Sequence, residues 1–140
     1  MIDIDALIPH RKPIKLISEV IDLGENVGTT VAVVDSGWPL FEDGRVNSLV
    51  LIEAIAQTSA LVEGYKRSRR GKSGVKGWLV GVKSADILVP SIPEKARLTI
   101  SVSSLYSFDN YGVVEGVVKS GDEIYMTAVL QALRLNPDTE

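Results

Sequence analysis

Residues 48–67 read SLVLIEAIAQTSALVEGYKR and form the one long helical pattern in this chain of 140 residues. Asn47 or Ser48 suits the N-cap position, and Gly71 follows the expected end of the helix. Apolar residues cover most directions around its first three turns, namely Leu49, Val50, Leu51, Ile52, Ala54, Ile55, Ala56, Ala60, Leu61 and Val62. A helix that is apolar nearly all round must be buried on several sides, so the rest of the chain has to cover it.

The segments on both sides of this helix have the composition of strands. Isoleucine, valine and threonine recur in them, and glycine, proline or aspartate marks the breaks between them. The expected strands are 14–23, 27–34, 76–89, 96–107, 111–119 and 123–135, with a short helical turn at 3–8. Residues 35–45, which contain Gly37, Pro39 and Gly44, are predicted to be a loop without regular structure.

This order of elements predicts an α+β protein in which one antiparallel sheet wraps around one long central helix. A chain of 140 residues has the usual size of one domain, so residues 1–140 are expected to share a single core. Most of the strands are joined by tight turns, as antiparallel neighbours require.

Composition excludes several classes of function. The chain has no cysteine, which rules out disulfides and a thiolate nucleophile, and its one histidine, His10, rules out a multi-histidine metal site. We expect no metal and no cofactor. The net charge is −3 and, outside one cluster at 66–76, the cations are scattered, so nucleic acid is not an expected partner.

The N-terminal residues MIDIDALIPHRKP lack the basic start and the unbroken apolar run of a signal peptide. No apolar stretch of about 18 residues is free of charge, so no membrane span is expected. A cytoplasmic location is the resulting prediction.

Glu53 is the residue that the apolar pattern does not explain. It stands in the second turn of the most apolar helix, where an ionised carboxylate without partners is costly. With Gln57, Ala60 and Gly64 it forms a stripe of polar and small residues, which is the composition expected for the floor of a cavity. A general acid is one interpretation of Glu53, and an ion pair with Arg11 or Arg45 is the other.

Four segments in order resemble the FabA/FabZ-type 3-hydroxyacyl-[acyl carrier protein] dehydratases, which have the hotdog fold. VLIEAIAQTSAL at 50–61 resembles their central-helix pattern V-L-I-x-E-A-x-A-Q, and LIPHRKPIKLISEVIDL at 7–23 resembles their L-P-H-R-x-P opening. The segments at 79–102 and 122–135 resemble the family's later strands. The shorter, divergent dehydratase-like proteins of the aryl-polyene type are the most similar members.

The resemblance implies roles for individual residues. Glu53 falls on the family's catalytic acid and Gln57 on its helix glutamine, which a hydrogen bond between helix and sheet would also explain. The family's H-F-P-G-x-P motif is replaced by GWPLFEDGRVNS at 37–48, which contains no histidine. His10 is then the one candidate for the base that removes the α-proton, with a packing role as the alternative.

Three further residues complete the candidate site. Trp38 and Phe41 in the replaced segment are interpreted either as caps of an acyl tunnel or as contacts with a neighbouring subunit. Asn47 lies where backbone N–H groups would polarise a thioester carbonyl, and capping of the helix is its ordinary role.

The leading hypothesis is therefore a lyase that removes water from a 3-hydroxyacyl thioester carried by acyl carrier protein or CoA, giving a 2-enoyl thioester. The alternatives are a non-catalytic acyl-binding subunit that partners an active dehydratase, and an acyl thioesterase. We expect a homodimer or higher homo-oligomer, or a hetero-oligomer with another hotdog protein, because a sheet of this kind leaves an edge strand open. The cations Lys66, Arg67, Arg69, Arg70, Lys72 and Lys76 are either a solvated helix end or, as the resemblance implies, a docking patch for an acidic carrier.

Overall fold

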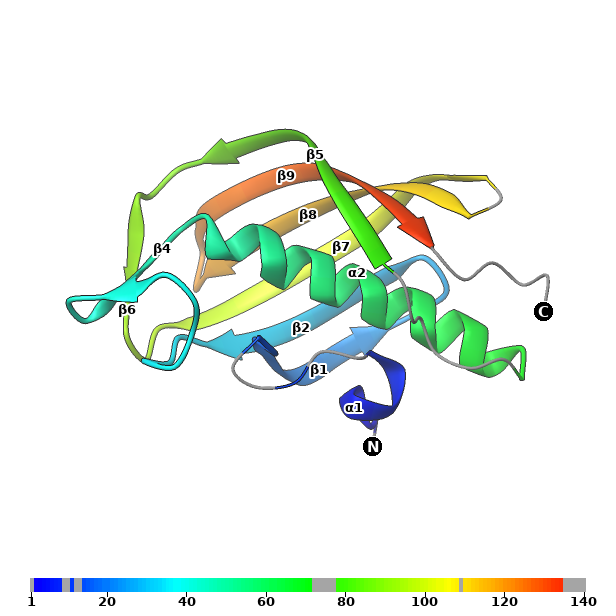
Figure 1. Cartoon of the computed structure of the whole chain (residues 1–140), viewed down its shortest axis with the longest axis horizontal. Helices are drawn as coiled ribbons and strands as arrows, with labels where there is room; N and C mark the ends of the chain where they lie inside the picture. Colours follow the sequence, from blue (N-terminus) through cyan, green and yellow to red (C-terminus); the bar gives the residue numbers. More distant parts are fainter. Residues whose placement is uncertain (1, 9–10, 12–13, 72–77, 109, 135–140) are drawn as a thin grey trace.

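The computed structural model describes residues 2–8, 11, 14–71, 78–108 and 110–134 (Figure 1). Two helices and nine strands lie within these ranges. In chain order they are α1 Ile4–Leu7, β1 Ile17–Leu23, β2 Val27–Val33, β3 Phe41–Glu42, β4 Arg45–Asn47, α2 Val50–Arg69, β5 Trp78–Ile87, β6 Ser91–Pro93, β7 Arg97–Phe108, β8 Tyr111–Ser120 and β9 Glu123–Arg134.

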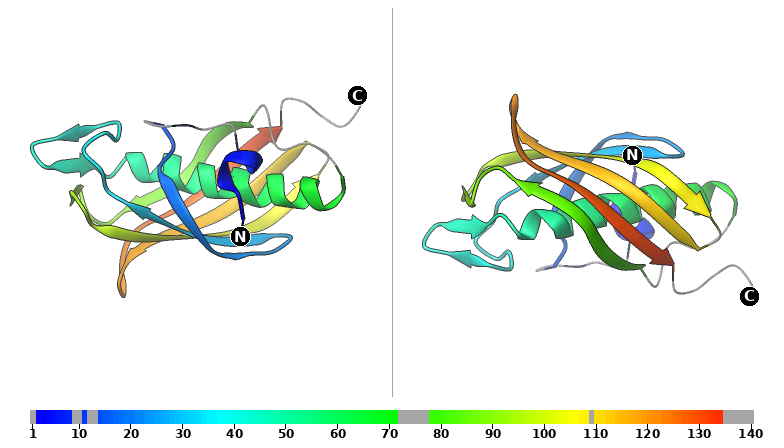
Figure 2. Two further views of the ribbon diagram at one scale, coloured as in Figure 1. Left: turned by 90° about the horizontal axis from the view of Figure 1, so that it is seen from below. Right: turned by 90° about the horizontal axis from the view of Figure 1, so that it is seen from above.

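Six of the strands form one antiparallel sheet in the order β1-β2-β7-β8-β9-β5. The sheet curves around α2, which packs against β7, β2, β1, β8 and β9 (Figures 1 and 2). The predicted α+β architecture, a hotdog arrangement of one long helix inside an antiparallel sheet, is confirmed. Because β1 and β5 are the outermost strands, each has one edge without a neighbouring strand in the described part of the chain.

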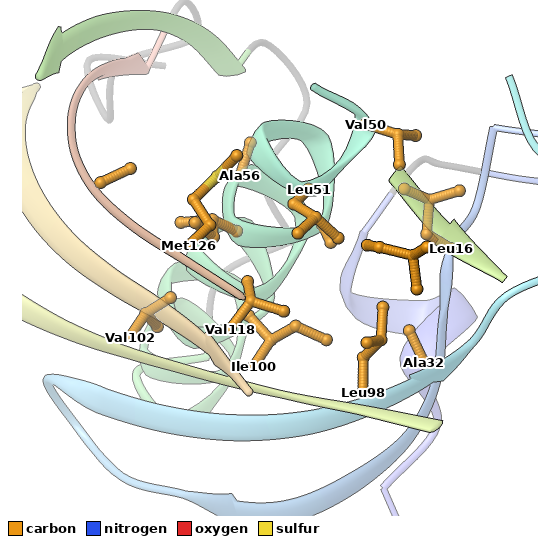
Figure 3. Close-up of a cluster of buried hydrophobic side chains, with 14 of the residues drawn as sticks. Leu16, Ala32, Val50, Leu51, Ala56, Leu98, Ile100, Val102, Val118 and Met126 are labelled. Carbon is orange, nitrogen blue, oxygen red and sulfur yellow. The ribbon is translucent and has the colours of Figure 1, made fainter. Parts of the chain in front are cut away.

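The core lies between α2 and the concave face of the sheet, where aliphatic side chains from both layers interlock (Figure 3). Leu51, Ala54 and Ile55 of the helix are fully buried, as the apolar pattern predicted. At Gly116 of β8 the helix approaches so closely that a Cβ atom would overlap Ile55 Cγ2 and lie 2.9 Å from Ile55 Cγ1. A glycine at this position is therefore a requirement of the packing between helix and sheet.

The helix begins slightly later than the pattern indicated. Leu49 flanks its first turn, and Asn47 Oδ1 accepts a hydrogen bond of 2.9 Å from the Leu49 N–H. Gly71, with φ of 74°, follows the last turn as expected. Asn47 thus supports the start of the helix from two residues before the N-cap residue, Leu49, and is not itself the N-cap.

The prediction that residues 35–45 form a loop without strands is wrong for its second half. β3 and β4 form a hairpin, and β4 pairs with β6, which lies in the break expected at 90–95. Asp43 and Gly44 connect β3 to β4 with φ values of 54° and 77°, the conformation that two-residue hairpin turns need. The dipeptide Asp-Gly was the available signal for this hairpin.

The N-terminal helix α1 packs on the central helix. A Cβ atom at Gly64 would lie 2.5 Å from the carbonyl oxygen of Leu7, so this glycine allows the contact. Ile4 and Ile8 are buried here with Ile17, Ala60 and Leu61 in a second apolar cluster. In the described part of the chain, neither helix combines the length and the apolar content that a bilayer crossing demands.

Gly116→Ala is expected to lower the free energy of unfolding by about 1–3 kcal/mol, because the new methyl group overlaps the fully buried, branched Ile55. Gly112→Ala in the same strand is the matched control, since its Cβ would lie 3.5 Å from the nearest atom, the Tyr106 carbonyl oxygen. Urea unfolding of both variants measures the difference. Equal stability of the two variants would contradict the close packing of β8 on α2.

Candidate active site

Glu53 lies in the first turn of α2 and is half-buried, between the partly buried Ile52 and the fully buried Ala54. Its carboxylate oxygen Oε2 accepts a hydrogen bond of 2.9 Å from the Nε2 group of Gln57, one turn further along the helix. The carboxyl group is therefore held against the helix at a defined place, as a reacting group has to be. The predicted pairing of Glu53 and Gln57 on one stripe is confirmed.

Gln57 is fully buried, and its side-chain amide joins the central helix to the segment that leads into β1. Nε2 donates to the Ile14 carbonyl oxygen at 2.6 Å as well as to Glu53, and Oε1 accepts from the Leu16 N–H at 2.8 Å. All of these contacts fit the interpretation of Gln57 as a link between helix and sheet. Its role in substrate binding stays a prediction.

The rest of the stripe is covered by protein, so the interpretation as a cavity floor is wrong for Ala60 and Gly64. Ala60 is buried among Ile4, Ile8 and Ile17, and Gly64 contacts the backbone of Leu7. Small residues occur here because a helix, and not a ligand, packs on them.

A second polar contact between helix and sheet was not found from the sequence. Thr58 Oγ1 donates to the Ala54 carbonyl oxygen at 2.9 Å and accepts from Thr30 Oγ1 of β2 at 2.8 Å. Both threonines are fully buried. Threonine is common in strands and helices alike, so nothing in the local pattern marks the pair.

Trp38 is buried in its own chain, where it joins the core between helix and sheet, and Phe41 packs against that core in part. Trp38 also lines a pocket of about 370 Å³ beside β1, together with Lys15, Leu16 and Asp35. Trp38 therefore has a role in the core of its own chain, which was not among the roles expected from the sequence. Contact with an acyl chain or a neighbouring subunit stays a prediction for both aromatic residues.

A buried hydroxyl group, that of Ser48, lies just before the start of α2. Ser48 is buried, its N–H donates to the Pro90 carbonyl oxygen at 3.1 Å, and its Oγ has no hydrogen-bond partner in the described part of the chain. Asn47 beside it is exposed, and its side-chain oxygen already accepts a hydrogen bond from the Leu49 N–H. A contribution of Asn47 to substrate binding stays a prediction.

His10, the predicted base, lies outside the described residues. Arg45, one proposed ion-pair partner of Glu53, donates instead to Ser91 Oγ at 2.7 Å and to the Ser91 carbonyl oxygen at 3.0 Å. Arg11, the other, donates to the carbonyl oxygens of Ile8 and Asp5. Within the described ranges, histidine and acidic side chains do not gather in a group of three that could hold a metal ion.

The segment that anchors Gln57 is itself held by an ion pair. Lys15 Nζ donates to Asp5 Oδ1 at 2.7 Å, which lowers the pKa of the Asp5 carboxyl group, and Arg11 adds a weaker attraction. This contact ties α1 to the residues just before β1. The orientation of Glu53 thus depends on the position of residues 14–16, because Gln57 binds both that segment and Glu53.

Comparison of the sequence with known proteins finds a family and relatives that are described as dehydratases. The model of the family described as ApeP-like, ApeP dehydratase, matches residues 2–140. The 3-hydroxyacyl-[acyl-carrier-protein] dehydratase FabZ of Alkaliphilus metalliredigens is 28% identical over 99% of this chain and 96% of its own length. FabZ of Caldanaerobacter subterraneus subsp. tengcongensis is 26% identical, over 91% of this chain and 92% of its own length.

Solved structures show the same fold at lower sequence identity. The dehydratase heterocomplex ApeI:P of Xenorhabdus doucetiae contains a chain with a TM-score of 0.89 and 22% identity, covering 97% of this chain and 93% of that one. A hypothetical thioesterase protein from Streptococcus pneumoniae TIGR4, solved with coenzyme A, has a TM-score of 0.65 and 14% identity, over 85% and 86%. These likenesses concern the hotdog fold alone.

Gln57→Leu is expected to lower the free energy of unfolding by about 1–3 kcal/mol, because the buried Leu16 N–H loses its side-chain partner and the Ile14 carbonyl loses a part-buried one. Gln131→Leu on the half-exposed surface of β9 replaces the other glutamine of the chain and should change stability by less than about 0.5 kcal/mol. Chemical denaturation measures both variants. A Gln57→Leu protein as stable as the control would remove the structural role assigned to this amide.

Proposed function

This chain belongs to the ApeP dehydratase family, and on that basis we propose that it removes water from a 3-hydroxyacyl thioester carried by acyl carrier protein, with Glu53 as the general acid. The observation that carries the proposal is the half-buried Glu53 carboxyl group, held in the first turn of α2 by Gln57. The FabZ relatives support the choice of substrate class, since they are 3-hydroxyacyl-[acyl-carrier-protein] dehydratases.

The reaction needs one proton removed and one proton supplied. A base takes the proton from C2, the C2–C3 double bond forms, and the hydroxyl group on C3 leaves as water after an acid has protonated it. Because the Gln57 N–H donates to Oε2 of Glu53, the proton of the neutral carboxyl group is favoured on Oε1. A proton on one defined oxygen atom would meet the C3 hydroxyl group in a defined orientation, which favours proton transfer.

The proposal assigns the base to His10, the one histidine of the chain. An imidazole changes protonation near neutral pH, so it can accept the C2 proton and return it to solvent in each cycle. The thioester carbonyl must be polarised for C2 to become acidic, which backbone N–H groups at a helix N-terminus can do. The Leu51 and Ile52 N–H groups already donate to the Ser48 and Leu49 carbonyl oxygens, so the proposal does not assign this role to them.

Glu53→Gln keeps the size and hydrogen bonding of the side chain but removes its acidic proton, so dehydration should fall by about 10²–10⁴-fold. His10→Ala should reduce turnover by a similar factor, with partial recovery when imidazole is added. Mass spectrometry of 3-hydroxyacyl-[acyl carrier protein] before and after incubation measures the loss of water.

Glu63→Gln is the matched control, because Glu63 is a half-buried acid on the same helix and forms an ion pair of 3.7 Å with Lys66. This variant should retain wild-type turnover. Wild-type rates in Glu53→Gln would refute the role of the carboxyl group, and full turnover of His10→Ala would refute that of the imidazole. Release of free thiol in place of an enoyl thioester would identify a thioesterase.

A second candidate function is that of a partner subunit without its own turnover. It is favoured by residues 37–48, which contain no histidine where the dehydratase motif would supply one, and by the heterocomplex in which the similar ApeI:P chain was solved. In that case the chain alone would leave the substrate unchanged, and a complex with an active hotdog subunit would dehydrate it even with Glu53→Gln.

We also propose that a second hotdog subunit, either another copy or a different protein, pairs along the free edge of β5. Residues 81–88 are exposed along their whole length, and Val82 and Leu88 keep 52% and 58% of their surface accessible. The other free edge, β1, contains two irregularities in register and the charged residues Glu19 and Asp22. β5 has one irregularity and the charged residues Lys83 and Asp86, so its exposed apolar side chains are the reason for choosing it.

Replacing Val82 and Ile87 with glutamate is expected to separate the subunits, because pairing would bury these charges without partners. Light scattering after size exclusion should then report the 15.1 kDa mass of one chain, whereas the unaltered protein shows a larger mass. Ile21→Glu on β1, where the side chain is 57% exposed, should leave the assembly intact. An unchanged mass after the β5 substitutions would exclude this edge as the interface.

A further inference from the structure

The hairpin that joins β7 to β8 exposes an apolar tip that the core does not use. Leu105 and Tyr106 keep 55% of their surface accessible and Phe108 keeps 70%. The rings of Tyr106 and Tyr111 meet edge to face with centroids 6.3 Å apart, so they present one aromatic surface. Across residues 104–114 the sequence contains a single charge, Asp109, which lies outside the described residues.

A positively charged helix end lies at the same end of the molecule. Arg69 and Arg70 are exposed in the last turn of α2 and just after it, and Lys66 is half-buried one turn earlier. Arg69 stacks over Tyr65, with 5.6 Å between the guanidinium carbon and the ring centroid. Glu25 lies 3.5 Å from Arg70 and Glu63 lies 3.7 Å from Lys66, so these two acids offset two of the three cations and Arg69 keeps this group of charges net positive.

The turn between β1 and β2 connects these two features. The Asn26 carbonyl oxygen accepts from the Ser104 N–H at 2.8 Å at the base of the hairpin, and Asn26 Oδ1 accepts from Lys66 Nζ at 3.4 Å. A cavity of about 40 Å³ is lined from both sides, by Lys66 of the helix and by Ser107 of the hairpin among others. Figures 1 and 2 agree in showing the hairpin tip and the end of α2 at one end of the fold.

We propose that this end of the molecule, formed by Leu105, Tyr106, Phe108, Lys66, Arg69 and Arg70, binds the surface of a membrane that contains anionic lipids. Apolar and aromatic side chains at a projecting tip can enter the region between headgroups and acyl chains, where tyrosine and other amphipathic rings are favoured. The cations beside them would lie at the level of the phosphate groups, where a negative surface potential attracts lysine and arginine.

The shape of the surface favours a bilayer over an acidic protein. The strongest contacts between proteins are anchor residues that fill pockets of the partner, with surrounding contacts that exclude water. Here the exposed apolar groups are at the tip of the β7–β8 hairpin, and the cations are on a different element, α2. A bilayer accepts a projecting tip without a matching pocket, and it also meets both elements at one plane.

Flotation of the full chain, together with any partner subunit that purifies with it, tests the proposal. The probes are vesicles of phosphatidylcholine with and without phosphatidylglycerol. Protein should float with the anionic vesicles, and added salt should weaken the binding. Tyr106→Ser combined with Phe108→Ser should reduce the affinity about tenfold, and Arg69→Gln and Arg70→Gln about fivefold each.

Two matched controls distinguish binding through this surface from nonspecific binding to vesicles. Ile21→Ser removes an equally exposed apolar side chain from β1, and Arg97→Gln removes an exposed cation from β7; both should bind vesicles like the unaltered protein. Glu53→Gln should also bind normally, because the proposed reaction is independent of this surface. In Phe108→Trp, tryptophan emission should shift to the blue when vesicles are added.

Absence of flotation with phosphatidylglycerol would overturn the proposal, as would hairpin variants that float like the unaltered protein. If the same hairpin and arginine variants instead lose binding to an acidic carrier protein while vesicles stay unbound, the surface docks a protein and the lipid assignment is wrong.

Discussion

Burial of the central helix is the constraint on which the rest of this structure depends. Leu51, Ala54 and Ile55 face the sheet, while Ala60 and Leu61 face α1, so no single flat layer can cover α2. The sheet solves this by curving around the helix, and the N-terminal segment closes the remaining side. Gly116 and Gly64 allow the two closest approaches, one to β8 and one to the backbone of Leu7.

A helix so enclosed can hold polar groups only where partners reach them. Gln57 meets this condition through Ile14, Leu16 and Glu53, and Thr58 through Thr30 and Ala54. Both residues join the helix to chain segments that are far away in sequence. The proposed acid, Glu53, thereby acquires its orientation from a structural amide, which links the stability of the N-terminal segment to the chemistry of the site.

The two ends and the two edges of the sheet are not equivalent, and this has consequences for partners. β1 has two irregularities in its pairing, whereas β5 has one and exposes two large apolar side chains, those of Val82 and Ile87. The β7–β8 hairpin and the basic end of α2 lie away from Glu53, which is in the first turn of the same helix. The proposed reaction, assembly and surface binding therefore involve different residues, and substitutions can test each of them separately.

The central helix, the main strands and the position of Glu53 could be predicted from the sequence, because each follows from a local pattern of residues. The apolar run at 48–67 predicted a buried helix, and Glu53 stood out within it. The β3–β4 hairpin was missed although Asp43-Gly44 encodes its turn, since Gly37 and Pro39 beside it dominated the interpretation.

The contacts between groups far apart in the sequence could not be predicted in this way. No local pattern shows that the amide of Gln57 reaches residues 14 and 16, that Trp38 enters its own core, or that α1 covers Gly64. Hydrogen bonds and close contacts of this kind depend on the path of the whole chain, because they join segments that come together only when the sheet has closed around the helix.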